Sequence, residues 1–414
     1  MCDLLTIREK RYEDILKRSE HATVVTVKAN LPGADKRFLW SDYAAWALYE
    51  ALVKRIRPGR RSAEHDAEGL VFLLEFAETA KDLKEICLSL ESEHPLGRLT
   101  DLDVYEKGRP LSRSDFSGEQ RTCFLCSQPA MMCARNKTHS EEALRGHIRD
   151  EVLSYLHAGP EYGTPHPVRC AELGLLSELC RAYGFGCVTA RDPGAHTDMD
   201  FFTFLESLPV VASGAGGLTD AHVSDFSLLR AYGRRVEERM FEATKGVNTH
   251  KGAIFLYLTV AAALRRKKDE EALPSVLRRL AAPVEEDFSR GGDTHGLTLY
   301  RAHGIRGIRG EALRGFPSLF LSERIPETQE ELLELTLCLL QNVEDTSAIH
   351  RAGTDGWRIL KQKAKLVQEH RLHPEELDAW CKEQRISTGG TADLLGATVF
   401  LLAMQAGERM GRKK

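Results

Sequence analysis

The stretch Ala-Thr-Lys-Gly-Val-Asn-Thr-His-Lys-Gly-Ala-Ile-Phe occupies positions Ala243–Phe255 and leads into an apolar run, Ala253–Leu264. That run predicts a buried helix. Two glycines bracket the polar residues before it, which are Asn248, Thr249, His250 and Lys251. A glycine-containing turn before a helix offers free backbone N–H groups and the positive end of the helix dipole, which suit a phosphate. We therefore expect these four residues to bind phosphate, and the alternative is a solvent-exposed helix start.

Length and charge limit the classes of protein that fit the chain. Its 414 residues are enough for two or three domains. A formal net charge of −4 gives no general attraction to nucleic acid or to a membrane surface, so neither is expected as a partner. The run Ala253–Leu264 is too short to span a bilayer, and Met1–Leu5 has no signal-peptide character. Ten cysteines in so long a chain do not indicate a secreted disulfide scaffold, so we expect a cytoplasmic protein.

The N-terminal third has the pattern of an α+β domain with a mixed or antiparallel sheet. A charged amphipathic helix is predicted at Leu5–Ser19, and Ser41 is expected to cap a second helix that turns Ala45, Leu48 and Leu52 inward. The strand candidates are Ala22–Lys28, Leu70–Phe76 and Ile86–Leu90, with a turn at Asn30–Gly33. The short connections between these strands favour hairpins over helical crossovers.

Asp101 and Asp103 are the first residues with a clear chemical implication. Successive side chains of a strand alternate between its faces, so both carboxylates would point the same way. Two carboxylates on one face suit Mg²⁺, which can bridge a triphosphate during nucleotidyl transfer. Just upstream, Gly97 and Arg98 form a turn with a cation for phosphate. The alternative is an exposed strand with two solvated aspartates.

A cluster of soft ligands follows this strand. Cys123, Cys126, Cys133 and His139 could close a tetrahedral, structural Zn²⁺ site. The alternative is a set of small apolar thiols beside a polar histidine. A redox pair is disfavoured because the surroundings do not resemble a thioredoxin-like unit.

Residues 4–156 resemble the apo-citrate lyase phosphoribosyl-dephospho-CoA transferases. The resemblance rests on Glu93–Val104, Leu111–Arg113, Cys123–Cys126, Cys133–Arg135 and Thr138–His139, with similar residues at Arg8–Arg11 and Asn30–Gly33. It implies transfer of a CoA-derived group to a serine of the lyase's acyl carrier subunit, with release of diphosphate. Asp101 and Asp103 would then hold Mg²⁺ while the serine attacks. Thr100 stands where that family carries a tryptophan.

Beyond a Gly- and Pro-rich segment, the patterns become helical. Helices are predicted at Ser140–Leu156, Glu331–Asn342 and from Pro374 onward. Polar stretches recur where these helices end. The candidates for phosphate are His196, Lys251, Arg309 and Arg351, and those for Mg²⁺ or a general base are Asp198, Asp200, Glu344 and Asp345, with Glu311 second. Carboxylates together with cations fit a metal–polyphosphate pocket better than a packed core.

These stretches resemble the triphosphoribosyl-dephospho-CoA synthases. The matching segments are Gly194–Asp200, Glu238–Phe255, Thr294–Gly296, Gly307–Pro317, Glu344–Gly353 and Ser387–Leu395. The resemblance implies an all-helical fold that joins ATP to 3′-dephospho-CoA and expels adenine. In the segment Ala182–Cys187 the chain departs from that family, because Gly184 takes the place of a lysine.

Both resemblances together predict a fused, bifunctional enzyme that makes the citrate lyase prosthetic group and installs it. The expected organisation is a transferase-like domain at 1–157, a linker at 158–167 and an all-α, synthase-like domain at 168–414. The expected substrates are ATP and 3′-dephospho-CoA, and the expected partner is the apo acyl carrier subunit. Two alternatives remain open. The N-terminal half could only bind the carrier, or the chain could be a regulator that binds nucleotide or CoA without turnover.

Overall fold

A computed structural model describes residues 4–31, 33, 35–111, 121–158, 166–289 and 294–411, with side chains as far as Gly407. Pro32, Ser112, Arg113 and linker residues 159–165 lie outside this described part. The chain divides into two compact units, Met1–Tyr155 and Leu156–Lys414, and each is described by itself.

The first unit is built on a five-stranded antiparallel sheet. Its order is β2-β3-β1-β4-β5. The strands are β1 (Thr23–Ala29), β2 (Arg60–Asp66), β3 (Gly69–Phe76), β4 (Thr100–Glu106) and β5 (Arg109–Pro110). The central strand β1 pairs Val25 with Leu74 of β3 and with Val104 of β4. The antiparallel form of the expected sheet is therefore the one observed.

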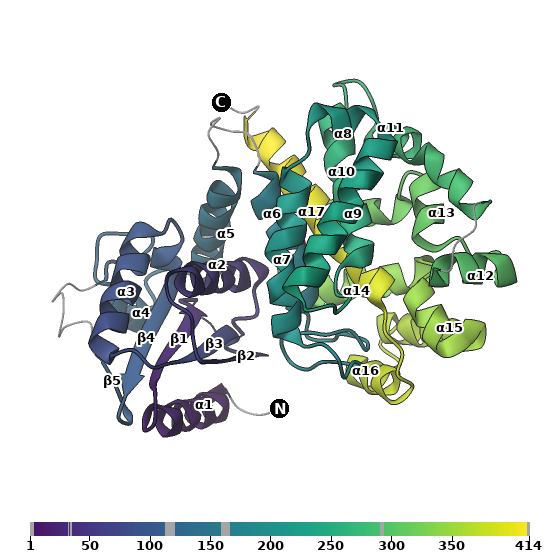
Figure 1. Cartoon of the computed structure of the whole chain (residues 1–414). Helices are drawn as coiled ribbons and strands as arrows, with labels where there is room; N and C mark the ends of the chain where they lie inside the picture. Colours follow the sequence, from purple (N-terminus) through teal and green to yellow (C-terminus); the bar gives the residue numbers. More distant parts are fainter. Residues whose placement is uncertain are drawn as a thin grey trace. The chain divides into compact units, whose positions relative to one another are not determined.

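Helices cover both faces of this sheet. On one face, Val24, Val71 and Tyr105 pack around Ile15 of α1 (Leu4–Ser19). On the opposite face, Phe72 stacks on Tyr49 of α2 (Leu39–Arg55) with ring centroids 4.1 Å apart, and α3 (Ala80–Glu93) packs against β4. Figure 1 shows α1 and α2 on opposite sides of the strands. Asp101 and Asp103 share the pleat of Tyr105, so both belong to the α1 face.

Two local predictions are wrong. Ile86–Leu90 is part of helix α3, because Leu83, Cys87 and Leu90 are buried at helical spacing. Ser41 does not cap a helix. It lies buried inside α2, whose N-cap residue is Phe38 without a side-chain bond.

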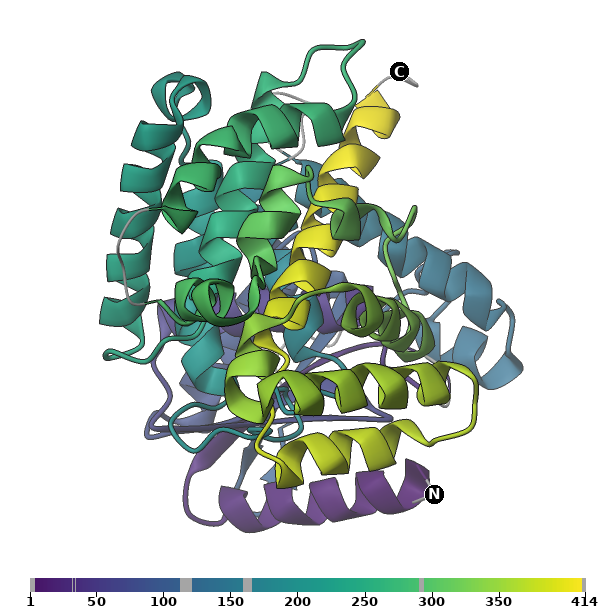
Figure 2. The same cartoon turned by 90° about the vertical axis from the view of Figure 1, so that its right-hand side faces the viewer.

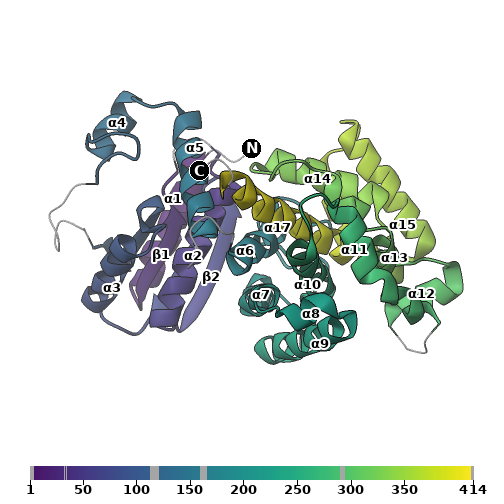
Figure 3. The ribbon, with the colours of Figure 1, turned by 90° about the horizontal axis from the view of Figure 1, so that it is seen from above.

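Other predictions in this unit are confirmed. The helix at Leu5–Ser19, the strands at Ala22–Lys28 and Leu70–Phe76, and the buried Ala45, Leu48 and Leu52 all agree with the structure. After β4 come α4 (Ala130–Asn136) and α5 (Glu141–His157), which agrees with the helix predicted at Ser140–Leu156. The short helix η1 (Gly97–Leu99) precedes β4, and Figure 3 shows α4 standing away from the strands, with a connecting segment that leads to α5.

The second unit is helical, and its described residues contain no strand. Its longer helices are α6 (Pro167–Leu179), α7 (Phe201–Gly216), α9 (Phe226–Ala243), α10 (Lys251–Arg266), α14 (Gln329–Asn342), α15 (Thr346–Gln368), α16 (Pro374–Glu383) and α17 (Gly389–Gly411). The shorter ones are α8 (Asp220–Ser224), α11 (Leu273–Ala281), η3 (Ala282–Phe288), α12 (His295–His303), α13 (Gly307–Leu313) and η4 (Pro317–Phe320). The helices expected at Ala253–Leu264, Glu331–Asn342 and from Pro374 are confirmed.

Helix α17 forms the centre of this unit. It packs against α6, α10, α14 and α15, and Figure 2 shows it running obliquely through the bundle. Its crossing with α6 is a backbone contact, because a Cβ added at Gly174 would lie 2.4 Å from the carbonyl oxygen of Gly396. Among the described residues, its segment Gly389–Gly407 is the one helix long and apolar enough to cross a membrane, and 67% of that window is buried inside the protein. Such burial is typical of a core helix, and the sequence analysis overlooked this segment.

Candidate active sites

In the first unit, the two aspartates of β4 face basic side chains. Lys28 Nζ lies 3.2 Å from Asp103 Oδ2. The guanidinium of Arg121 contacts Asp101 and also donates to Glu91 at 2.8 Å. Burial opposes the charge on Arg121, yet these two carboxylates raise its pKa above the usual range. Each aspartate therefore already has a cation beside it.

A cavity of about 480 Å³ opens beside Asp101 on the α1 face. Its wall carries Arg8, Lys28 and Lys36. Arg8 and Lys36 share one carboxylate, Glu68, at 2.7 and 3.4 Å. More cations than acids converge on this wall, as a phosphate-bearing ligand requires. Lys28 and Lys36 were not expected at a site from the sequence, and only the fold brings both to this wall.

Arg98 lies apart from this cavity. Its Nη2 donates to the carbonyl oxygen of Thr122 at 2.8 Å, and its guanidinium lies 5.8 Å from the ring centroid of Phe124. The side chain therefore braces the chain next to the cysteine cluster.

The four soft ligands predicted from sequence do converge. Their ligand atoms, on Cys123, Cys126, Cys133 and His139, all lie within 4.8 Å of one another. Cys126 Sγ is 3.5 Å from Cys133 Sγ and 3.3 Å from His139 Nε2. Zn–S bonds of about 2.3 Å in a tetrahedron place two sulfurs about 3.8 Å apart, so this spacing fits zinc.

The second unit contains a cavity of about 1260 Å³. It collects residues that are far apart in the sequence, because the polar ends of several helices meet around it. Among the residues predicted for the site, its wall includes His196, Asp198, Asn248, Thr249, Lys251, Arg309, Glu344 and Arg351. The prediction of a polar pocket at the helix ends therefore agrees with where the structure places these residues.

The basic residues of this cavity have acidic or polar neighbours. Lys251 Nζ lies 2.5 Å from Glu237, and Arg309 Nε lies 3.2 Å from Asp287, which also binds Arg230 at 2.7 Å. Glu237, Asp287 and Arg230 line the cavity and were missed by the sequence analysis. The Lys251 side chain is 51% exposed, so a phosphate could replace its carboxylate partner without desolvating it.

The N-terminus of α10 is arranged differently from the sequence expectation. Asp393 of α17 accepts a hydrogen bond from the backbone N–H of Ala253, and desolvation together with Glu178 raises the pKa of Asp393 well above its usual value. A Cβ added at Gly252 would lie 2.0 Å from Asp393 Oδ2. A carboxyl group of the protein, whose raised pKa favours its neutral form, thus occupies part of the position expected for phosphate, and Gly252 leaves the space for it.

Four candidates do not line this cavity. Asp200 caps α7 by accepting from the Thr203 N–H at 2.8 Å, and Asp345 caps α15 through the N–H groups of Ser347 and Ala348. Glu311 is buried and binds Arg314 at 2.6 Å. His250 is also buried, and both of its ring nitrogens have protein partners. In this structure the four side chains are engaged within the protein.

His196 and Glu344 have specific roles in the wall. Burial and the adjacent Arg351 lower the pKa of His196, whose Nε2 lies 3.0 Å from Ser387 Oγ. A neutral imidazole is therefore favoured beside the cavity. Glu344 Oε2 accepts from the N–H groups of Arg306 and Gly307 at 2.8 and 3.0 Å, which fixes the start of α13.

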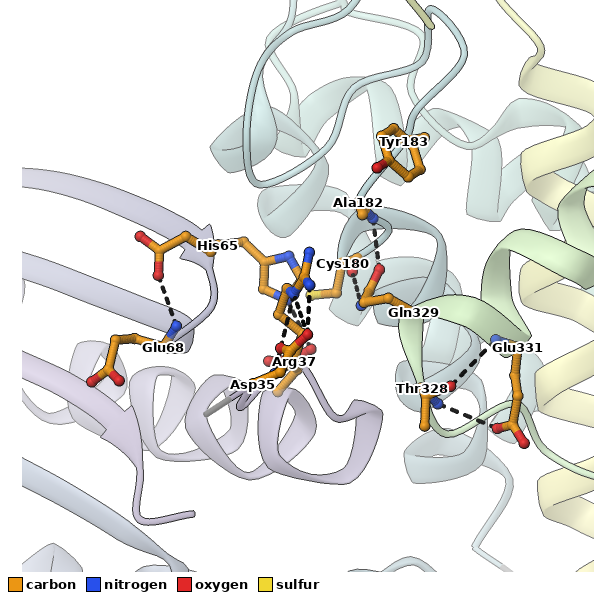
Figure 4. Close-up of polar contacts among 12 residues, drawn as sticks. Asp35, Arg37, His65, Glu68, Cys180, Ala182, Tyr183, Thr328, Gln329 and Glu331 are labelled. Atoms are coloured by element: carbon orange, nitrogen blue, oxygen red, sulfur yellow. Dashed lines mark hydrogen bonds and ion pairs between the residues drawn. The ribbon is translucent and has the colours of Figure 1, made fainter. Parts of the chain in front are cut away.

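Arg181 also lines the cavity and was missed. The residue is 2% exposed, and its two Nη atoms have no hydrogen-bond partner within the described part of the chain. Gln329 fixes its backbone from both sides, because it accepts from the Ala182 N–H at 2.7 Å and donates to the Cys180 carbonyl at 2.9 Å (Figure 4). Its Nε donates to the carbonyl oxygen of Glu178 at 2.9 Å. Leaving the two buried Nη groups of a guanidinium unpaired is costly unless an anion or water binds them.

Arg181 lies three residues before Gly184, the position at which the sequence resemblance implied a lysine. A Cβ at Gly184 would lie 2.4 Å from the carbonyl oxygen of Cys187, so this position has no room for a side chain. Arg181 is thus a basic residue of the same segment that does reach the cavity wall.

Comparison with known proteins gives a family match for each of the two regions that contain these sites. Residues 165–412, more than half of the chain, match the family described as ATP:dephospho-CoA triphosphoribosyl transferase. The chain belongs to this triphosphoribosyl transferase family. Residues 1–155 match a second family, apo-citrate lyase phosphoribosyl-dephospho-CoA transferase.

Relatives of this triphosphoribosyl transferase include fused proteins. Protein CitXG of Haemophilus influenzae is 32% identical, covering 79% of this chain and 78% of the relative. Protein CitXG of Leuconostoc mesenteroides subsp. cremoris is 27% identical over 95% and 94%. A 2-(5′′-triphosphoribosyl)-3′-dephosphocoenzyme-A synthase of Haemophilus ducreyi is 28% identical over 68% of this chain and 99% of that protein. The chain is accordingly a bifunctional transferase of citrate lyase prosthetic-group assembly.

Proposed function

We propose that the two activities are carried by separate domains, a transferase-like domain at 1–157 and a synthase-like domain at 168–414, joined by a linker at 158–167. In the second domain, the 2′-hydroxyl of 3′-dephospho-CoA attacks C1 of the ATP ribose. The C1–N bond to adenine breaks, adenine leaves and the hydroxyl proton passes to a base. The product is 2′-(5′′-triphosphoribosyl)-3′-dephospho-CoA.

The observation that carries this proposal is the 1260 Å³ cavity of the helical unit. It is large enough for two nucleotide-sized substrates, since small-ligand pockets measure roughly 300–1,000 Å³. Lys251, Arg309 and Arg351 are proposed to hold the triphosphate, together with the enclosed Arg181. Asp198 and Glu344 offer the oxygen ligands that Mg²⁺ prefers. When bound, Mg²⁺ would neutralise phosphate charge in this cavity.

In the first domain, the triphosphoribosyl product is proposed to enter the cavity lined by Arg8, Lys28 and Lys36. A serine hydroxyl of the apo acyl carrier subunit attacks the phosphate bound to ribose, and diphosphate leaves. Asp101 and Asp103 supply hard oxygen ligands for Mg²⁺ on one strand face. As long as no Mg²⁺ is bound, Arg121 and Lys28 orient these two carboxylates.

The cysteine cluster is proposed to bind one structural Zn²⁺ ion. Its spacing supports this, and no open position is needed for chemistry. Arg121 links the cluster to the proposed transferase site, because it stands two residues before Cys123 and contacts Asp101. A Zn²⁺ ion bound by these four ligands would therefore hold Arg121 in place. The enzyme is proposed to work in the cytoplasm, where these thiols remain reduced.

One assay tests the assignment of the first reaction. Purified chain is incubated with ATP, 3′-dephospho-CoA and Mg²⁺, and adenine is quantified by chromatography. Adenine equimolar with the triphosphoribosyl product supports the proposal. Tight binding of both substrates without adenine would support a regulator and would contradict it.

A further inference from the structure

A chain of hydrogen bonds leads from the wall of the large cavity into the core. Thr249 lines the cavity, and its Oγ1 donates to Ser207 Oγ at 2.8 Å. Ser207 Oγ lies 2.8 Å from His250 Nδ1, and His250 Nε2 lies 3.1 Å from Glu178 Oε1. Ser207 and His250 are both 0% exposed, so solvent does not interrupt the chain.

The hydrogen bonds can be satisfied in two protonation states. With a neutral imidazole, the Ser207 hydroxyl donates to Nδ1, and Nε2–H donates to the Glu178 carboxylate. With an imidazolium, Nδ1–H donates to Ser207 Oγ, and the serine hydroxyl turns to the carbonyl oxygen of Phe204 at 3.0 Å. The second acceptor for Ser207 therefore lets His250 gain a proton without leaving a buried group unpaired.

We propose that this chain removes the proton of the attacking hydroxyl in the synthase reaction, with His250 as its final acceptor. As the substrate oxygen bonds to C1 of the ribose, its proton passes to Thr249 Oγ1. The proton of Thr249 moves to Ser207, and that of Ser207 moves to His250 Nδ1. Adenine departs as its anion with the electron pair of the broken C1–N bond and takes a proton from solvent, and Glu178 balances the charge of the imidazolium.

The carboxylates first expected to act as the base are less suitable. Asp200 and Asp345 cap helices, and Glu311 is bound to Arg314. Asp198 is 66% exposed, so water competes for its oxygens. Glu344 already accepts two backbone N–H groups through one oxygen. Thr249 is placed differently, because the residue lines the cavity and its hydroxyl donates into a chain that ends at a buried acceptor.

This inference rests on the proposed synthase reaction, and its test uses the whole chain with ATP and dephospho-CoA. Thr249→Val keeps the shape of the side chain and removes its hydroxyl, whereas Thr249→Ser keeps the hydroxyl. We expect Thr249→Val to lower kcat about 100-fold with a nearly unchanged KM for ATP, and Thr249→Ser to stay within a few-fold of wild type. Thr336→Val, which removes a buried helix hydroxyl away from the cavity, is the matched control.

A double-mutant cycle separates one relay from two independent contacts. Ser207→Ala should lower kcat about as much as Thr249→Val, and the double variant should lose little more, because either change breaks the same chain. Thermal melts of all variants show whether each one is folded. The relay would be overturned by a wild-type kcat in Thr249→Val, or by an equal decrease in kcat in Thr249→Val and Thr249→Ser. It would also be overturned if the decrease in kcat of the double variant equalled the product of the two single decreases. Failure of the wild-type chain to release adenine would instead overturn the assigned reaction.

Discussion

Replacing Gly252 of α10 with alanine tests how tightly this helix packs against Asp393 of α17. The added Cβ would lie 2.0 Å from Asp393 Oδ2 and 3.1 Å from its Cγ, which is less than van der Waals contact. The Asp393 carboxylate would have to move, and the Ala253 N–H would lose its acceptor. The clash resembles overpacking, at about 1–3 kcal/mol, and the unpaired donor adds about 1–3 kcal/mol.

Alanine gives back up to about 1 kcal/mol through its higher helix propensity. The net loss should be about 1–5 kcal/mol, which corresponds to a decrease in Tm of about 2–20 °C for a unit of this size. Differential scanning calorimetry measures this decrease. Gly233→Ala in helix α9 is the matched control, because its Cβ would lie 3.4 Å from Leu258 Cδ1 of helix α10, which is an ordinary contact.

A second variant checks the cause of the loss. If the clash with Asp393 dominates, Gly252→Ala combined with Asp393→Ala should melt close to Asp393→Ala alone. Strict additivity of the two losses would mean that the carboxylate is not the obstacle. A Gly252→Ala chain that melts within about 1 °C of wild type would refute the argument.

Four further predictions concern charge and metal. Purified protein should contain about one zinc per chain by mass spectrometry, and Cys126→Ser should lose it; wild-type protein without zinc would leave only the packing interpretation. Asp101→Asn should abolish transfer to the carrier serine and leave adenine release intact, and equal loss of both activities would contradict two separate sites. The folded pKa of Asp393 is raised above its ordinary value of 3.8, so its contribution to stability is complete below that pH and decreases as pH rises toward the folded pKa. As pH rises above 3.8, Asp393→Asn should therefore lose less stability than wild type does, and parallel unfolding curves would contradict the shift. Lys251→Ala should lower kcat/KM for ATP. It should change the free energy of unfolding by less than about 1 kcal/mol, because Lys251 is half exposed in its ion pair with Glu237. An unchanged kcat/KM would remove Lys251 from the site.

The sequence was most informative where function depends on local composition. The β-branched content of Ala22–Lys28 predicted β1, and Leu70–Phe76 was correctly named as a strand candidate. The cysteine spacing predicted a ligand cluster whose atoms do lie close together. The polar helix ends also predicted much of the large cavity, including Asp198 and Arg351. Helix ends attract polar residues and also form the walls of clefts, so both signals coincide there.

The remaining candidate residues could not be assigned from the sequence, because their roles depend on partners that are distant in the chain or on local geometry. Asp200 and Asp345 have the composition of a metal site, but an acidic residue before a helix looks the same in sequence when it is a cap. Asp393 lies in a stretch already noted, yet its role depends on Gly252, distant in the chain. Arg181 had no local signal, since only Gln329 and the fold place it beside the cavity.

The close crossing of Gly174 and Gly396 has a consequence for biosynthesis. Helix α6 begins the second unit, and its backbone partner α17 is its last helix, so more than two hundred residues must be translated between them. The first unit, by contrast, takes its strands from residues 23–110 and can assemble while the helical region is still on the ribosome. Helix α7 can cover part of α6 early, but the face of α6 that packs against α17 stays uncovered until α17 emerges. Nascent chains stalled before α17 should therefore be bound by chaperones through the helical half, while the first unit already resists protease.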